Sequence, residues 1–290
     1  MSKKSTRSVV ISVRLDETTL TAVDLLVNAG LAQSRSEAAS QFIAIGVQLS
    51  EELIIKAKEL EQSVQRLKNE MLEAVKSQNL DQVKYLLEID EKLKDAKSEE
   101  GQTAVLMSAY DRAHEIRELL LQKGAELNVY EAAAVGHTAR IAEIVGETPT
   151  LVNSHSFDGY TPLGLAAHFG QEEAAAYLLS HGADPNLKGT DGKLNNTPLH
   201  ASIAGNHMNL VHMLLEKGAD IDSRCEGELR KGFTPLHVAV HFDRLEIAKL
   251  IIAQGANLSI PNSESLTPLA YASSKGSAEM AELIQTALNQ

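Results

Sequence analysis

Thr234-Pro-Leu-His237, followed by Gly255-Ala-Asn257, decides the fold of this 290-residue chain, because close copies of both motifs recur along it. Thr-Pro-Leu also begins at residues 161, 197 and 267, so that the spacings are 36, 37 and 33 residues. Gly-Ala-Asp recurs in phase at Gly182 and Gly218. A period of roughly 20 to 50 residues is the sequence signature of stacked structural repeats. Most of the chain is therefore expected to form a mainly α-helical solenoid.

The residue types within each repeat indicate a pair of helices. Proline fixes φ in the first turn of a helix, where its missing N–H costs nothing. Glycine takes the left-handed conformation that ends a helix. Such a pair cannot bury its own apolar face, so stability comes from stacking against the next pair. The apolar residues expected between repeats are Leu178-Leu179, Leu214-Leu215 and Ile251-Ile252.

These motifs resemble the ankyrin-repeat family over about residues 69–290, as six or seven repeats of which the first ones diverge. A degenerate copy begins at Thr103, and another, near Tyr130, lacks Thr-Pro-Leu but keeps the phase. The resemblance implies a domain that binds another protein and catalyses nothing. It also implies that His200 and His237, the fourth residues of Thr-Pro-Leu-His, bond neighbouring loops.

Two features of the repeats mark candidate binding surfaces. The hairpins between Gly182 and Thr197 and between Gly218 and Thr234 are three or four residues longer than the others; they are either a binding surface or neutral variation. In the family, the ends of the first helices face a concave groove. The aromatic residues there either contact a partner or pack on the neighbouring hairpin. The candidate partner-binding residues are Tyr110, His168, Phe169, His241, Phe242 and Lys275.

Residues 9–15, Val-Val-Ile-Ser-Val-Arg-Leu, alternate in the period of two that predicts a strand with one buried face. Asp16 is the expected N-cap of a helix that ends at Gly30. Ser34-Arg-Ser-Glu37 predicts a capping box for a second helix, with Phe42 and Ile45 on its apolar face. One strand and two short helices are too small to fold alone, so a dimer is expected.

This head resembles the ribbon-helix-helix family over about residues 8–49, in which two chains pair their strands and place the ribbon in the DNA major groove. The resemblance implies a homodimer, or a higher oligomer, on double-stranded operator DNA; the alternative is a head that only dimerises. Base contacts would come from Val10, Ser12 and Arg14. Phosphate contacts would come from a disordered basic arm, residues 1–7, with Lys3, Lys4 and Arg7, and from Ser34, Arg35 and Ser36. The dimer core would hold Ile11, Val13, Leu15, Phe42 and Ile45.

The charge distribution is compatible with such a head. The chain carries a net charge of -12, but residues 1–50 carry +1 and the remaining residues -13. An acidic total therefore says nothing against DNA binding by the head.

Residues 50–74 connect the head to the repeats. Apolar residues from Leu53 to Ala74 alternate at spacings of four and three, the heptad pattern of a coiled coil. Two explanations stay open: a parallel coiled coil that continues the dimer, or a helix packed on its own repeats. The expected fold class is thus mainly α, with a ribbon-helix-helix dimer head, a helical stalk and an ankyrin-repeat solenoid.

Other classes of protein find little support in the sequence. No run of 18 apolar residues predicts a membrane span, and the basic N-terminus is not followed by the apolar run of a signal peptide. The single cysteine, Cys225, excludes an internal disulfide and a cysteine-built zinc site. We expect no metal, no cofactor and no catalysis, and a cytoplasmic location in a cell of prokaryotic, phage or plasmid context.

The sequence therefore predicts a dimeric DNA-binding transcriptional regulator whose ankyrin repeats bind a protein partner. An alternative is an antitoxin or inhibitor that neutralises a specific target through its repeats and uses the head for autoregulation. In a third hypothesis, the head only dimerises a scaffold. Both main hypotheses rest on family resemblance, because a fold alone does not define a function.

Overall fold

The computed structural model describes residue 14, residues 16–49 and residues 51–290. The chain divides into two compact units, with the boundary between Arg66 and Leu67. Within the described residues the structure is helical and contains no strand, apart from one isolated antiparallel bridge between Lys97 and Thr103. The expected mainly α fold is confirmed at this level.

The first unit contains α1 (Glu17–Asn28), α2 (Arg35–Leu49) and the first part of α3 (Glu51–Lys76). Asp16 caps α1 as predicted, because its Oδ1 accepts the backbone N–H of Thr19 at 2.7 Å. The predicted capping box of α2 is only half right. The Glu37 amide donates to Ser34 Oγ at 3.2 Å, but the Glu37 carboxylate accepts the N–H of Gln33 instead of that of Ser34. The predicted strand, residues 9–15, lies outside the described residues except for Arg14, which is exposed.

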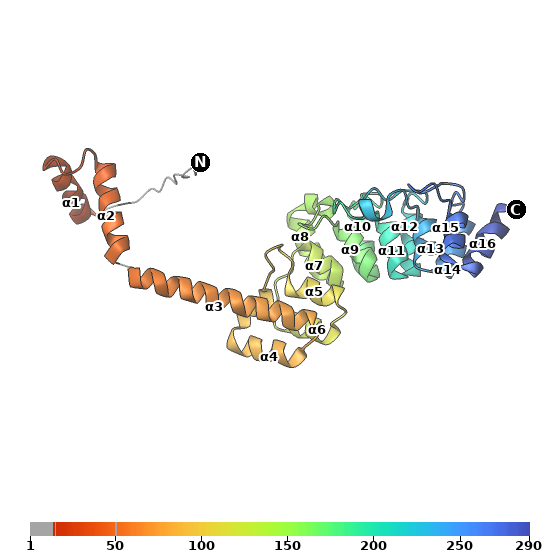
Figure 1. Ribbon diagram of the computed structural model, residues 1–290, viewed down its shortest axis with the longest axis horizontal. Coiled ribbons are helices and arrows are strands. Elements are labelled where there is room, and N and C mark those ends of the chain that lie inside the picture. Colours follow the sequence, from red (N-terminus) through yellow and green to blue (C-terminus); the bar gives the residue numbers. More distant parts are fainter. Residues whose placement is uncertain (1–13, 15, 50) are drawn as a thin grey trace. The chain divides into compact units, whose positions relative to one another are not determined.

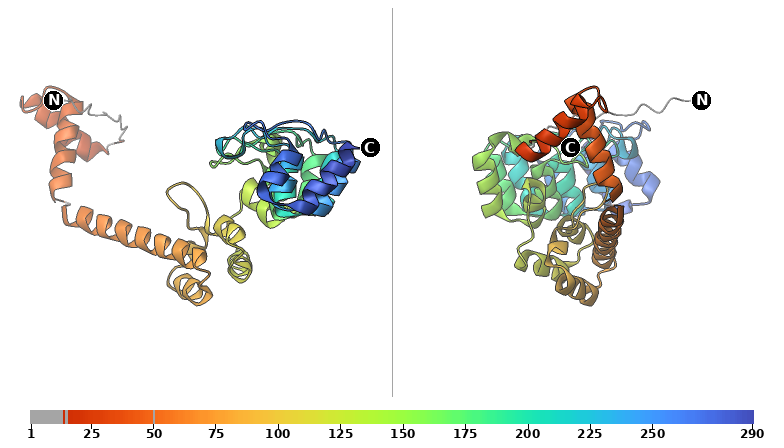
Figure 2. Two further views of the ribbon diagram at one scale, coloured as in Figure 1. Left: turned by 45° about the vertical axis from the view of Figure 1, so that its right-hand side comes forward. Right: turned by 90° about the vertical axis from the view of Figure 1, so that its left-hand side faces the viewer.

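Residues 67–290, here called the stack, form a row of helix–turn–helix pairs (Figure 1). The first helix of each pair packs on the first helix of the next pair, and the second helices form a parallel layer. The left panel of Figure 2 shows the connecting hairpins gathered on one side of these layers. The first helices, after the end of α3, are α5 (Ala104–Tyr110), α7 (Val129–Val135), α9 (Pro162–Phe169), α11 (Pro198–Gly205), α13 (Pro235–His241) and α15 (Pro268–Lys275). The second helices are α4 (Leu80–Ile89), α6 (His114–Gln122), α8 (Thr138–Glu147), α10 (Glu172–Ser180), α12 (Met208–Glu216), α14 (Leu245–Ala253) and α16 (Ala278–Leu288), with short 3₁₀ turns η1 (Glu91–Asp95), η2 (Pro149–Asn153) and η3 (Glu228–Arg230).

The Thr-Pro-Leu motif starts the first helices for the reason expected from the sequence. Threonine is the N-cap and proline occupies the first turn of α9, α11, α13 and α15. Thr161 Oγ1, for example, accepts the N–H of Gly164 at 3.0 Å. A side-chain oxygen at the cap satisfies a backbone donor that the helix itself leaves without a partner.

The end of α3 belongs to the stack, which corrects the prediction of a stalk that runs to residue 74. Met71 and Ala74, two positions of the predicted heptad seam, are buried in the core that the repeats share. Leu67 packs on the edge of that core. Apolar surface already buried within one chain cannot form the interface of a coiled coil. The alternative of a helix packed on its own repeats therefore holds for this part of α3, whereas Leu60 is exposed.

Hydrogen bonds between repeats fix the stack beneath the hairpins. Asn186 donates through Nδ2 to the Gly218 carbonyl at 3.0 Å and accepts the Asp220 N–H at 2.7 Å. One repeat earlier, Asn153 makes the same two bonds to Gly182 and Asp184. Such bonds set the rotation of each repeat on the next, because both partners are backbone groups.

Candidate functional site

The described part of the head has a small core and a large apolar surface. Val23, Ala32 and Ala38 are its buried apolar residues, where α1 meets α2. The predicted dimer-core residues Phe42 and Ile45 are 40% and 52% exposed. Other large apolar side chains are exposed as well: Leu20, Leu25, Leu31, Ile43 and Val47. Phe42 and Ile45 are thus available to a second chain, and their role in a dimer stays a prediction.

The structure describes only part of the predicted DNA-binding residues. Arg35 pairs with Asp24 through two hydrogen bonds, Nε to Oδ1 at 2.5 Å and Nη2 to Oδ2 at 2.7 Å, which raise the pKa of the guanidinium. Ser34 Oγ accepts the N–H of Glu37, and Ser36 is exposed at the start of α2. A phosphate at this site would compete with Asp24 for Arg35. Outside the described residues lie Lys3, Lys4, Arg7, Val10, Ser12, Ile11, Val13 and Leu15.

The structure brings three of the predicted partner-binding residues together at the ends of α5 and α9. The rings of Tyr110 and Phe169 meet edge to face with centroids 5.0 Å apart, and His168 lies 4.8 Å from Phe169. Loss of hydration around its ring lowers the pKa of His168, although part of the residue is exposed. Phe169 is half-buried on Tyr110 and therefore packs on a neighbouring repeat while keeping part of its ring exposed.

The other three predicted partner-binding residues meet at the ends of α13 and α15. Lys275 Nζ donates to the His241 carbonyl at 2.8 Å, and the Tyr271 hydroxyl and His241 Nδ1 share a hydrogen bond at 2.7 Å. Phe242 is half-buried, with the Arg230 guanidinium 4.8 Å from its ring centroid. Because Arg230 belongs to the finger of the same repeat, this contact does not decide between the two explanations, and the role of Phe242 in partner binding stays a prediction.

The hairpin that precedes the first helix of a repeat is called the finger below, and the two elongated fingers form one ordered unit. The backbone N–H groups of Gly227 and Leu229 donate to the carbonyls of Leu194 and Lys193 at 3.0 Å and 2.9 Å. A Cβ on Gly227 would lie 2.3 Å from the Lys193 carbonyl carbon, so the close approach requires glycine. The inserted residues thus build a continuous surface across two repeats.

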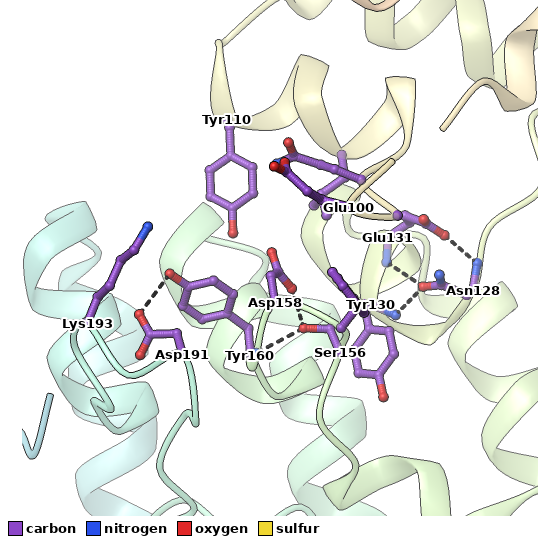
Figure 3. A pocket seen from close by; sticks show the side chains of 14 residues that line it. Glu100, Tyr110, Asn128, Tyr130, Glu131, Ser156, Asp158, Tyr160, Asp191 and Lys193 are labelled. Carbon is purple, nitrogen blue, oxygen red and sulfur yellow. Dashed lines mark hydrogen bonds between the residues drawn. The ribbon is translucent and has the colours of Figure 1, made fainter. Parts of the chain in front are cut away.

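The third repeat lacks a finger, and a cavity occupies the vacant place. Residues 123–128 join α6 directly to the N-cap of α7. The fingers on either side are closed by backbone hydrogen bonds, from Ser98 N to Gln102 O at 2.9 Å and from Ser156 N to Tyr160 O at 2.8 Å. The space between them measures about 520 Å³. It is called the tyrosine cavity below, after Tyr110, Tyr130 and Tyr160 in its walls (Figure 3).

Acidic groups dominate the charge of the tyrosine cavity. Its lining includes the carboxylates of Glu100, Asp158 and Asp191 and one basic side chain, Lys193. Burial and the nearby Asp191 and Asp158 raise the pKa of Tyr160 to about 12. Burial likewise raises the pKa of Tyr110, with a contribution from the same two carboxylates. The phenols therefore stay protonated, and the site carries negative potential.

Sites for other chemistry are not evident in the described residues. In that part of the chain, no group of three or more His, Cys, Asp or Glu residues could hold a metal ion, and no helix is long and apolar enough to cross a membrane. Burial raises the pKa of Cys225 to about 12, which keeps its thiol protonated and weakly nucleophilic. His200 and His237 have the expected structural place: their Nε2 atoms donate to the carbonyls of Phe233 and Leu266 in the next repeat at 3.2 Å and 2.9 Å.

The fold is that of a helical-repeat protein, a class whose extended surfaces bind other molecules. Three features define it: stacked helix pairs with fingers on one side, threonine-capped first helices, and histidines that bridge adjacent repeats. Family models for ankyrin repeats match residues 129–225, 199–252 and 236–284. The chain belongs to the ankyrin-repeat family, whose repeats bind proteins.

Comparison with curated proteins gives the same family. An ankyrin repeat protein of Rickettsia felis is 32% identical over 170 residues, which cover 54% of this chain and 72% of that protein. The B-cell lymphoma 3 protein homolog of Mus musculus is 30% identical over 41% of this chain but only 25% of its own length. The 26S proteasome regulatory subunit p28 of Saccharomyces cerevisiae is 26% identical, over 54% of this chain and 68% of its own.

Several residues of the tyrosine cavity were not predicted as site residues from the sequence. Tyr130, the pair Asp158 and Tyr160, and Asp191 come from three different repeats and share no motif. The short connection at residues 123–128 was the available signal, because it leaves too few residues for a finger.

Proposed function

We propose that this protein is a dimeric DNA-binding transcriptional regulator whose stack binds a protein partner. Two heads pair through their apolar surfaces, and the strand predicted at residues 9–15 reads the operator with Val10, Ser12 and Arg14. The regulator acts in the cytoplasm and includes no catalytic step.

The observation that carries the proposal is the apolar surface of the head. Within its described residues, the head buries three apolar side chains and leaves Phe42 and Ile45 exposed. So small a described core favours a head that is stabilised by a partner. Several large apolar side chains exposed on one small unit are typical of an interaction site. A second copy of the chain is the simplest partner, because the predicted strand also needs another strand to pair with.

The stack supports the second half of the proposal. Its family consists of protein-binding repeats, and one relative, the yeast proteasome regulatory subunit, is by its name a component of a protein assembly. The exposed parts of Phe169 and His168 and the joined fingers supply the contact surface. Residues Ala57, Leu60 and Val64 of α3, outside the stack, are proposed to continue the dimer as a short coiled coil.

Selection of bound DNA from random and genomic fragments tests the function. At about 0.15 M salt the wild type is expected to enrich one palindromic site. Arg14→Ala is expected to weaken that site by about 1–3 kcal/mol per half-site, the value of one side chain hydrogen-bonded to a guanine edge. Arg140→Ala, which removes the same charge from the stack, is the matched control and should bind as the wild type does. Failure of the wild type to enrich any sequence would leave the head as a dimerisation unit only.

A further inference from the structure

We propose that the tyrosine cavity receives a cationic side chain, arginine or lysine, presented by the protein partner. The inference adds to the proposed function the chemistry that the stack recognises, and it rests on that function only for the existence of a protein partner. Four properties of the cavity carry it: its origin, its rings, its charge and its position.

The origin of the cavity is the missing finger of the third repeat. Asn128 and Tyr130, at the start of α7, lie open between the fingers at residues 98–102 and 156–160. A regular finger there would fill this space. Its volume of about 520 Å³ is within the range of roughly 300 to 1,000 Å³ that is usual for ligand sites.

Aromatic rings form much of the wall. Figure 3 shows Tyr110 and Tyr160 entering the cavity from different elements, with the Tyr160 hydroxyl directed at Asp191, to which it donates a hydrogen bond at 3.4 Å. The Tyr130 hydroxyl donates to Ser154 Oγ at 2.8 Å and to the His155 carbonyl at 2.7 Å, so its polar end is already bonded. A cation is attracted to the face of an aromatic ring, and more strongly where water is excluded. The aliphatic stem of a lysine or arginine can lie on the same rings and on the buried Leu106.

The charge of the lining selects a cation over an anion. Asp158 is half-buried and accepts a hydrogen bond from Ser156 Oγ, which holds its carboxylate in place. Asp191 accepts the N–H groups of Leu194 and Asn195 and is likewise fixed. Glu131 is buried and its carboxylate accepts the N–H of Asn128 in the cap of α7, so we do not assign it a direct contact with the cation. The exposed Lys193 opposes an incoming cation, but solvent screens a charge at the surface.

The position of the cavity points to a side chain on a larger partner. The cavity opens among the fingers, and Phe157 at the tip of one finger is 83% exposed. A Cβ on Gly101 would lie 3.9 Å from the Phe157 ring, so this ring stands beside the neighbouring finger, across the gap. An exposed ring next to an acidic cavity offers contacts to the main chain on either side of an inserted side chain.

Tyrosine-ring NMR of the full chain tests the proposal. The chain has six tyrosines, and Tyr85, Tyr177 and Tyr271 lie outside the cavity and serve as internal controls. The probe is the capped pentapeptide Gly-Ala-Arg-Ala-Gly, titrated against its neutral citrulline counterpart, with signals assigned through Tyr→Phe variants. The arginine peptide is expected to shift Tyr110, Tyr130 and Tyr160, and the citrulline peptide to leave them unchanged.

Two variants separate the cavity from the general acidity of the chain. Asp158→Asn keeps the size of the side chain and its bond to Ser156, and should weaken arginine-peptide binding roughly fivefold. Glu216→Gln removes one charge from the exposed end of α12 and should not change binding. Equal shifts from both peptides, shifts spread evenly over all six tyrosines, or no shift at the highest peptide concentration would overturn the proposal. The titration uses neither DNA nor a partner protein, so such a result would not bear on the proposed regulator function. The DNA selection experiment tests that function separately.

Discussion

At the scale of single residues, buried histidines make the stack sensitive to acid. Burial lowers the pKa of His200 to about 4 and also lowers the pKa of His237. A histidine in the unfolded chain has a pKa of about 6.5. Between pH 6.5 and 4 the unfolded chain therefore binds more protons than the folded one. The stabilising effect of the neutral histidines is therefore complete above pH 6.5 and is lost as the pH falls toward 4. His200 alone accounts for a loss on the order of 3 kcal/mol of unfolding free energy.

Thermal unfolding from pH 7.5 to 4.5 measures this effect. His200→Gln is expected to lower the melting temperature at pH 7, because the bond to the Phe233 carbonyl is lost, and to flatten the pH dependence. His212→Gln changes an exposed histidine on α12 and should reproduce the wild-type curve. A pH dependence that His200→Gln leaves unchanged would contradict the role of burial.

The structural roles of His200 and His237 could be predicted because both belong to copies of Thr-Pro-Leu-His, the motif that carries the resemblance to the ankyrin-repeat family. Both rings do bridge to the next repeat. The tyrosine cavity could not be predicted in that way. Tyr110, Tyr130 and Asp158 come together only through the rise and rotation between repeats, which no local pattern records. The predicted partner-binding residues are an intermediate case. Their positions in the repeats could be predicted from the sequence, but the contacts between their rings could not.

At the scale of elements, the joined fingers depend on one close backbone approach. Gly227→Ala would place a methyl group 2.3 Å from the Lys193 carbonyl carbon and 2.4 Å from the Leu194 nitrogen. The expected cost is about 1–3 kcal/mol of unfolding free energy, because backbone on both sides must move.

Denaturant unfolding compares this variant with Gly146→Ala in α8. That glycine has no atom within 4 Å of an added Cβ and a helical backbone, so alanine there should be neutral or stabilise by about 0.5–1 kcal/mol. Equal stability of the two variants would show that the fingers do not depend on each other.

The helix α3 has two different halves, which the heptad pattern alone did not separate. Amphipathic spacing predicts an apolar face but does not say what covers it, and the buried Met71 shows that the stack covers the end. Met71→Ala should cost about 2–5 kcal/mol of stack stability. Leu60→Ala, at a position 66% exposed, should leave the melting temperature of the stack unchanged. Similar losses for both would mean that the stack extends further along α3.

At the scale of the whole molecule, the ankyrin repeats and the head differ in how far the sequence defines them. The ankyrin repeats were predictable because their motifs recur, so that each copy supports the others, and family models match them over residues 129–225, 199–252 and 236–284. The head is a single short unit, and the strand predicted at residues 9–15 lies outside the described residues except for Arg14. Its assignment therefore depends on the exposed apolar surface around Phe42 and Ile45.

The molar mass in solution tests the central claim most directly. Sedimentation equilibrium of the full chain is predicted to give twice the chain mass of 31.3 kDa, and Phe42→Asp to give the single chain mass, because a carboxylate cannot be buried in the shared core. The Phe242→Ala variant, changed in the stack, should remain dimeric. A wild-type protein that stays monomeric at micromolar concentration would contradict the paired head, and with it the reading of DNA by two strands.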